Sequence, residues 1–89
     1  MVRRRRLKLP DWYDWEFSLS AHVERRMQDR DFSEVTLRRM LATPSGIRPA
    51  VYPGRFVVAC ELAGQGWVVV VEPDIEDRVV VVVTAYRPG

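Results

Sequence analysis

Two sets of polar side chains in this sequence have the types and spacing that chemistry requires. His22, Arg26 and Arg30 follow one another at intervals of four residues, so on a helix they form one stripe. His22 is the only histidine of the chain, and histidine is the only side chain that ordinarily titrates near neutral pH. Thr84 and Tyr86 are two residues apart, so on a strand both hydroxyls leave the same side. If the two sets meet around one pocket, a proton-transferring imidazole lies beside groups that bind an anion.

The hydroxyl pair ends the stretch Arg78–Tyr86, which contains five consecutive valines. Such a run predicts a strand that is covered on both sides and lies at the centre of a small sheet. Two strands are predicted before it, over Arg55–Leu62 and Trp67–Glu72, with a tight reversal at Gly64–Gly66 between them. A shorter strand is expected at Val51–Tyr52. Because short turns join the strands, the sequence predicts an antiparallel meander.

Two helices are predicted ahead of this sheet. The first covers about Ala21–Arg30, begins at a serine cap and ends at Asp31. The second covers about Glu34–Ala42, with Ser33 as its cap, and a loop over residues 44–49 follows because prolines and a glycine interrupt it. The predicted fold is therefore α+β, with two N-terminal helices packed on one face of a small antiparallel sheet.

The N-terminal segment is basic and aromatic. We divide the chain into this segment, residues 1–16, and a single domain over residues 17–89. Trp12, Trp15 and Phe17 are expected to form an aromatic clasp that packs on the domain, with a short strand near Glu16–Leu19. Arg3–Arg6 has two open interpretations, a tail that follows a phosphate backbone and a solubilising tail.

Charge and cysteine content exclude several classes of protein. The net charge is +2, but Arg3–Arg6 supply four of the fourteen basic residues, so the rest of the chain has ten basic and twelve acidic residues, a balance of −2. That balance argues against a DNA-reading domain with a wide basic face. The single cysteine, Cys60, allows no internal disulfide and no multi-cysteine metal site. No apolar run reaches membrane-spanning length, and we expect a cytoplasmic protein with no membrane partner.

A longer pattern resembles a known family. The spacing His22-x3-Arg26-Met27-x2-Arg30, followed by Phe-Ser, by Thr-Pro after the second helix, by Pro-Gly-Arg55 and by a closing Thr84-x-Tyr86, resembles the DUF4258 family. That family is similar to RelE-like and BrnT-like toxins and to the barnase/EndoU/colicin/RelE superfamily of small ribonucleases. The resemblance covers about residues 17–87 and implies a RelE-like fold. The sequence departs from the pattern at Asp31, where a glycine is usual.

The resemblance implies RNA cleavage without a metal or another cofactor, by attack of the ribose 2′-hydroxyl on the adjacent phosphate. In that reaction His22 would transfer protons, and Arg26 one turn later would favour the neutral imidazole. Either Arg26 or Arg55 would hold the phosphate. Thr84 and Tyr86 would donate hydrogen bonds to phosphate oxygens, or Tyr86 would stack on a base. Arg55 is thus also a substrate-binding candidate, and four further arginines are candidates for substrate contacts only: Arg30, Arg48, Arg78 and Arg87.

The implied partners are RNA, with ribosome-associated mRNA or tRNA as the candidates, and a cognate antitoxin protein. A homodimer is a third expectation, because valine-rich strands aggregate unless their edges are covered.

Each site residue also has a structural interpretation, which stays open. A lone histidine beside a core stripe is often a boundary residue bonded to a backbone carbonyl, and the arginines could pair with surface carboxylates. Threonine is common in strands, and a tyrosine near a strand end often packs with a solvated hydroxyl. The corresponding alternative function is a non-catalytic protein-interaction module of the same fold that acts through a sheet edge.

Overall fold

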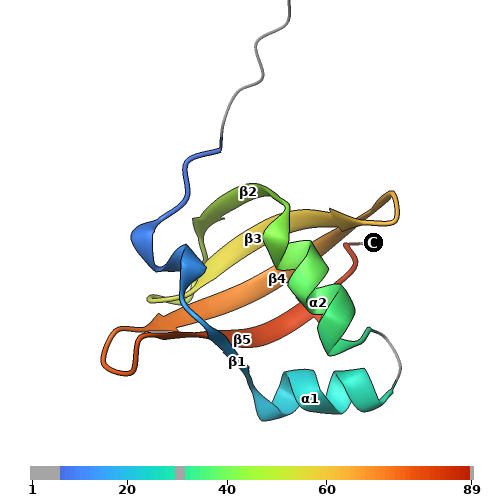
Figure 1. Ribbon diagram of the computed structural model, residues 1–89, viewed down its shortest axis with the longest axis horizontal. Helices are drawn as coiled ribbons and strands as arrows, with labels where there is room; N and C mark the ends of the chain where they lie inside the picture. Colours follow the sequence, from blue (N-terminus) through green and yellow to red (C-terminus); the bar gives the residue numbers. More distant parts are fainter. Residues whose placement is uncertain (1–6, 30–31, 89) are drawn as a thin grey trace, which may run out of the picture.

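The computed structural model describes residues 7–29 and 32–88 (Figure 1). These residues form two α-helices, one short 3-10 helix and a five-stranded sheet, so the α+β class is confirmed. The strands are β1 (Phe17–Leu19), β2 (Pro44–Pro49), β3 (Phe56–Leu62), β4 (Gln65–Asp74) and β5 (Val79–Tyr86), and the helices are η1 (Asp11–Asp14), α1 (Ala21–Gln28) and α2 (Glu34–Ala42).

The sheet is mixed. Its order is β1-β5-β4-β3-β2, and β1 pairs parallel with β5 while every other pair is antiparallel. The prediction of an antiparallel sheet with the helices at the N-terminus is therefore wrong in two respects, because η1 and β1 precede both helices and β1 joins the sheet. Parallel strands need a long connection, and the chain from α1 to β4 supplies it.

Burial alternates along β5. Val80 and Val82 are at most 5% exposed, whereas the valines at 79, 81 and 83 are only partly buried. In Figure 1, α2 lies across one face of the sheet, and α1 follows β1 and lies next to the later part of β5. The described residues therefore cover one face, and the prediction of a strand covered on both sides is wrong. Valine is also common on the half-exposed face of a sheet. A run of valines therefore does not by itself distinguish a strand covered on both faces from a strand covered on one.

Residues 44–49 form the edge strand β2 and not the predicted loop. The strand begins at Pro44 and ends at Pro49. Proline has no backbone N–H to donate to a neighbouring strand, and β2 tolerates both prolines because it is at the edge of the sheet. The strand predicted at Val51–Tyr52 is absent from the described structure, since these two residues lie in the turn before β3. Val51 is fully exposed there.

The reversal between β3 and β4 is one residue earlier than predicted. Leu62 pairs with Gln65, so the loop consists of Ala63 and Gly64 alone. Both residues have positive φ, 52° and 79°, as a two-residue hairpin turn requires. Strand β4 consequently begins at Gln65 and continues to Asp74, beyond the predicted end at Glu72.

Both helices begin where the sequence predicts. Helix α2 has the predicted bounds, and Ser33 and Thr36 form a capping box at its start. Helix α1 ends at Gln28, and the predictions for Arg30 and Asp31 fall outside the described residues. Neither of the described α-helices is long and apolar enough to cross a membrane.

The aromatic segment packs on the domain as predicted. The Trp12 ring centroid lies 4.9 Å from that of Phe56, and the Tyr13 hydroxyl donates a 2.8 Å hydrogen bond to the carbonyl oxygen of Leu41. Trp15 and Phe17 also contact the hydrophobic core. The predicted domain boundary between residues 16 and 17 stays a prediction.

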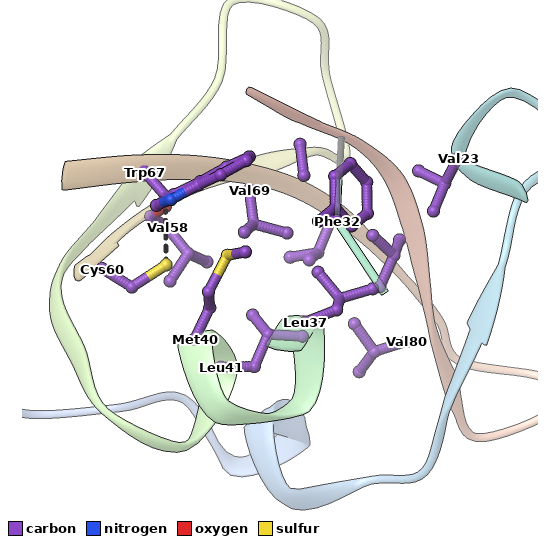
Figure 2. Close-up of a cluster of buried hydrophobic side chains, with 13 residues drawn as sticks. Val23, Phe32, Leu37, Met40, Leu41, Val58, Cys60, Trp67, Val69 and Val80 are labelled. Carbon is purple, nitrogen blue, oxygen red and sulfur yellow. Dashed lines mark hydrogen bonds between the residues drawn. The ribbon is translucent and has the colours of Figure 1, made fainter. Parts of the chain in front are cut away.

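The core lies between α2 and the covered face of the sheet (Figure 2). Leu37 and Met40 are fully buried and face the sheet valines, among them Val58 and Val69. The hydrophobic effect acts on this layer because helix and sheet each bury one apolar face against the other.

Truncating Leu37 should destabilise the domain. Leu37→Ala removes a fully buried side chain and is expected to lower the free energy of unfolding by about 2–5 kcal/mol. Val35 is 62% exposed on the same helix, so Val35→Ala is the matched control and should change it by less than about 0.5 kcal/mol. Urea unfolding followed by circular dichroism measures both, and equal losses would contradict the packing described.

Candidate functional site

Helix α1 begins beside the end of β5. Ser20 precedes the helix, and its hydroxyl accepts a hydrogen bond from the Val23 amide and donates one of 2.9 Å to the carbonyl oxygen of Val83. The backbone N–H of Ser20 also donates to the carbonyl oxygen of Val82, at 3.0 Å. The first turn of α1 is therefore held next to the last residues of β5.

A β-bulge in β5 makes this double contact possible. Val71 pairs with Val82 and Val70 pairs with Thr84, so Val83 is an extra residue. In a regular strand, successive carbonyls point to opposite neighbours. At the bulge, the carbonyls of Val82 and Val83 both accept hydrogen bonds from Ser20. The bulge thereby aligns the end of β5 with the start of α1.

Thr84 and Tyr86 lie on the face of the sheet opposite the core. They pair with Val70 and Val68, two residues apart on β4, so their side chains share one face, as the alternation predicts. Ala85 between them is fully buried on the other face. Tyr86 is 40% exposed and Thr84 is partly buried, so the tyrosine hydroxyl is the more accessible of the two.

His22 and Arg26 lie on α1, one turn apart. His22 is exposed in the first turn, next to the fully buried Val23, and Arg26 is partly buried. Among the hydrogen bonds and ion pairs of the described residues, none joins His22 to Thr84 or Tyr86. The four residues come from two elements that meet at Ser20, and the shared pocket between them stays a prediction.

Arg87 lies at the same end of the sheet. Its guanidinium is 5.8 Å from the ring centroid of Trp67 and donates a 3.2 Å hydrogen bond to the side-chain oxygen of Gln65. A shallow depression there is lined by Gln65, Gly66, Arg87 and Pro88. Trp67 is buried on the core face, so the Arg87 guanidinium lies on the side of the sheet opposite the Tyr86 side chain.

Arg78 lies at the opposite end of β5, and Arg55 lies two strands away from β5, just before β3 begins. Arg78 immediately precedes β5, and with a rise of about 3.3 Å per residue the strand places its first and last residues about 23 Å apart. The Nε atom of Arg55 is 2.9 Å from a carboxylate oxygen of Glu72, and its guanidinium is 4.3 Å from the ring centroid of Tyr52. The structure therefore does not bring these two arginines to the end of β5. Arg30 lies outside the described residues.

Cys60 and Tyr13 are protonated at neutral pH. Burial raises the pKa of the Cys60 thiol to about 11, so it is a poor nucleophile. Burial, and secondarily the nearby Cys60, raises the pKa of the Tyr13 hydroxyl above its ordinary value. Within residues 7–29 and 32–88, no three histidine, cysteine, aspartate or glutamate side chains are grouped as metal ligands.

Sequence reasoning missed a second candidate site. A cleft of about 360 Å³ lies between the segment from η1 to β1 and α2, and Asp14, Trp15, Glu16 and Arg38 contribute to its lining. The signal in the sequence was the alternation of acidic and aromatic residues over 14–17, whose aromatic members we interpreted mainly as packing.

Residues 19–87 match the sequence model of one protein family, described as a domain of unknown function, DUF4258. The match spans most of the chain and includes both α-helices, β2 to β5, and the bulge in β5. No curated protein and no solved structure shows significant similarity to the chain.

Replacing Ser20 should loosen the start of α1. Ser20→Ala removes the helix cap and the hydroxyl contact to β5, and we expect a loss of about 1–2 kcal/mol in the free energy of unfolding. Ser18→Ala is the control, because Ser18 is exposed on β1 and two residues away. Urea unfolding measures both variants. A Ser18→Ala loss as large as that of Ser20→Ala would contradict the role of this contact.

The buried thiol predicts a dependence of stability on pH. Because the pKa of Cys60 is higher in the folded chain than its ordinary value of 9.0, its contribution is complete below about pH 9 and is lost as the pH rises toward 11. Urea midpoints measured from pH 8 to 11 should therefore decrease, and Cys60→Ala should reduce the slope. Rapid alkylation of the native thiol by iodoacetamide at pH 8 would show that the thiol is not buried.

Proposed function

The chain belongs to the DUF4258 family, and we propose that it is a small metal-independent ribonuclease, the toxin of a toxin–antitoxin pair. The observation that carries the proposal is the contact of Ser20 with Val82 and Val83. It holds the start of α1, which bears the exposed imidazole of His22, against the end of β5, which bears the hydroxyls of Thr84 and Tyr86. An imidazole and hydrogen-bond donors are the groups that the proposed RNA cleavage would use.

In the proposed reaction, the neutral imidazole of His22 takes the proton of the ribose 2′-hydroxyl as its oxygen attacks the adjacent phosphorus. The bond from phosphorus to the 5′-oxygen breaks, and the imidazolium returns a proton to that leaving oxygen. The products are a 2′,3′-cyclic phosphate and a free 5′-hydroxyl, so protons and electrons balance. No metal is needed, because the imidazole moves the proton.

Negative charge develops on the non-bridging phosphate oxygens during this attack. Arg26 is proposed to stabilise it as a cation, and Thr84 and Tyr86 as hydrogen-bond donors. Arg87 lies at the same end of the sheet, but its guanidinium is over Trp67 on the other face, so we propose it only as a contact for RNA that passes around the strand end. Arg55 is less suited, since Glu72 already pairs with it and it lies two strands away from β5.

The proposed partners follow from this activity. RNA is the proposed substrate class because the reaction uses the 2′-hydroxyl of ribose. The proposed substrates of such a toxin are mRNA or tRNA in the cytoplasm. A ribonuclease of this kind needs an inhibitor in its own cell, which we propose is a cognate antitoxin protein.

A second candidate function is a non-catalytic protein-interaction module. Its supporting observation is the sheet face that the described residues leave uncovered, with Val57, Val68, Val70 and Val81 at its centre. Partly exposed valines on adjacent strands suit contact with another protein. The edge strand β2 suits it less, because it is bounded by two prolines.

Removing the imidazole should abolish RNA cleavage. In the presence of a chelator, wild-type protein should cleave single-stranded RNA and leave 2′,3′-cyclic phosphate ends. His22→Ala should reduce the rate by about 10²-fold or more, because the proton transfer is lost. Gel analysis of end-labelled RNA measures the rate, and mass spectrometry identifies the ends. Equal rates for the two proteins would remove His22 from the mechanism.

A charge-matched pair of variants tests Arg26. Arg25 is exposed on the same helix, so Arg25→Ala removes the same charge from a position one residue away. We expect Arg26→Ala to lower the cleavage rate at least tenfold and Arg25→Ala to leave it within about twofold. Circular dichroism verifies that each variant is folded. Lack of cleavage by any form, together with a stable complex or dimer in sedimentation, would favour the interaction module.

A further inference from the structure

The cleft between the η1–β1 segment and α2 has the size of a ligand site. Its volume of about 360 Å³ falls within the roughly 300–1,000 Å³ of small-molecule pockets. Both walls are fixed independently of any ligand. On one side, the Tyr13 hydroxyl donates to the carbonyl oxygen of Leu41, and on the other, the Val80 amide donates to the carbonyl oxygen of Glu16.

The floor and walls of the cleft are apolar. Val71 and Val80, 1% and 5% exposed, belong to its floor, and the rings of Tyr13, Trp15 and Phe17 contribute to its walls. One aromatic ring already contacts a guanidinium, because Arg38 lies 4.8 Å from the ring centroid of Phe17. Aromatic faces attract cations through their quadrupole, so the walls favour a positively charged occupant.

The charged groups around the cleft also favour a cation. Asp14 and Glu16 are both exposed at the cleft, and within residues 7–29 and 32–88 neither carboxylate takes part in an ion pair. Among the described residues of the lining, Arg38 is the only one with a basic side chain, and it forms an ion pair with Glu34, 2.9 Å from a carboxylate oxygen. The lining therefore has two carboxylates without a counter-charge.

We propose that this cleft binds an arginine side chain of a partner protein, with the guanidinium between Asp14 and Glu16 and its methylenes on the aromatic walls. Arginine fits better than lysine because its planar fork bonds carboxylates in pairs and stacks on aromatic rings. The site lies between η1, β1 and α2, and its residues are not those proposed for RNA cleavage. Binding here is therefore independent of the proposed ribonuclease activity.

The test compares an arginine compound with its neutral isostere. N-acetyl-arginine amide should shift the indole N–H signal of Trp15 in NMR spectra of the full chain, whereas N-acetyl-citrulline amide, which lacks the charge, should bind at least tenfold more weakly. Trp12 and Trp67 are not among the residues that line the cleft and serve as internal controls. Equal binding of the two compounds, or no shift at Trp15, would overturn the proposal.

Two sets of variants complete the experiment. Asp14→Asn combined with Glu16→Gln should weaken arginine binding at least tenfold, while Asp11→Asn, also in η1 but outside the cleft, should leave it unchanged. An equal effect of Asp11→Asn would indicate non-specific attraction and overturn the site. Deleting residues 1–6 should not change the affinity; tighter binding after deletion would identify Arg3–Arg6 of this chain as the occupant and overturn the assignment to a partner.

Discussion

The parallel pairing of β1 with β5 is the contact on which the rest of the structure depends. Phe17–Leu19 pairs with Val80–Val82, across more than sixty residues of chain. Ser20 follows β1 directly, so the pairing fixes where α1 begins. Glu16 precedes it, and its carbonyl accepts from the Val80 amide, so the pairing also fixes the aromatic segment. Both candidate sites are therefore positioned by three residues of one short strand.

Local signals in the sequence predicted local structure well. The bounds of α2 follow from Ser33 at its cap and from the spacing of Leu37, Met40 and Leu41, all of which lie within ten residues. The order of β3, β4 and β5 follows from short turns between apolar runs. Residues close together in the sequence determine these elements, so the sequence alone predicts them.

Long-range contacts could not be read in this way. A strand of three residues has no measurable periodicity, so nothing in Phe17–Leu19 indicated a parallel partner at the far end of the chain. The prolines at 44 and 49 indicated a break, because the sequence does not reveal that β2 is an edge strand where prolines are tolerated. For the site, the shared face of Thr84 and Tyr86 follows from alternation, but the contact of Ser20 with β5 depends on a bulge hidden among identical valines.

The bulge also explains why the run contains five valines. A strand with four valines could pair with β4 without interruption, and Tyr86 would still face the same side, because the extra residue lies opposite no partner of its own. What the shorter strand would lack is the second carbonyl turned toward Ser20. The fifth valine is therefore explained by the contact with α1 and not by the pairing with β4. The part of Val83 that makes this contact is its backbone carbonyl oxygen and not its side chain.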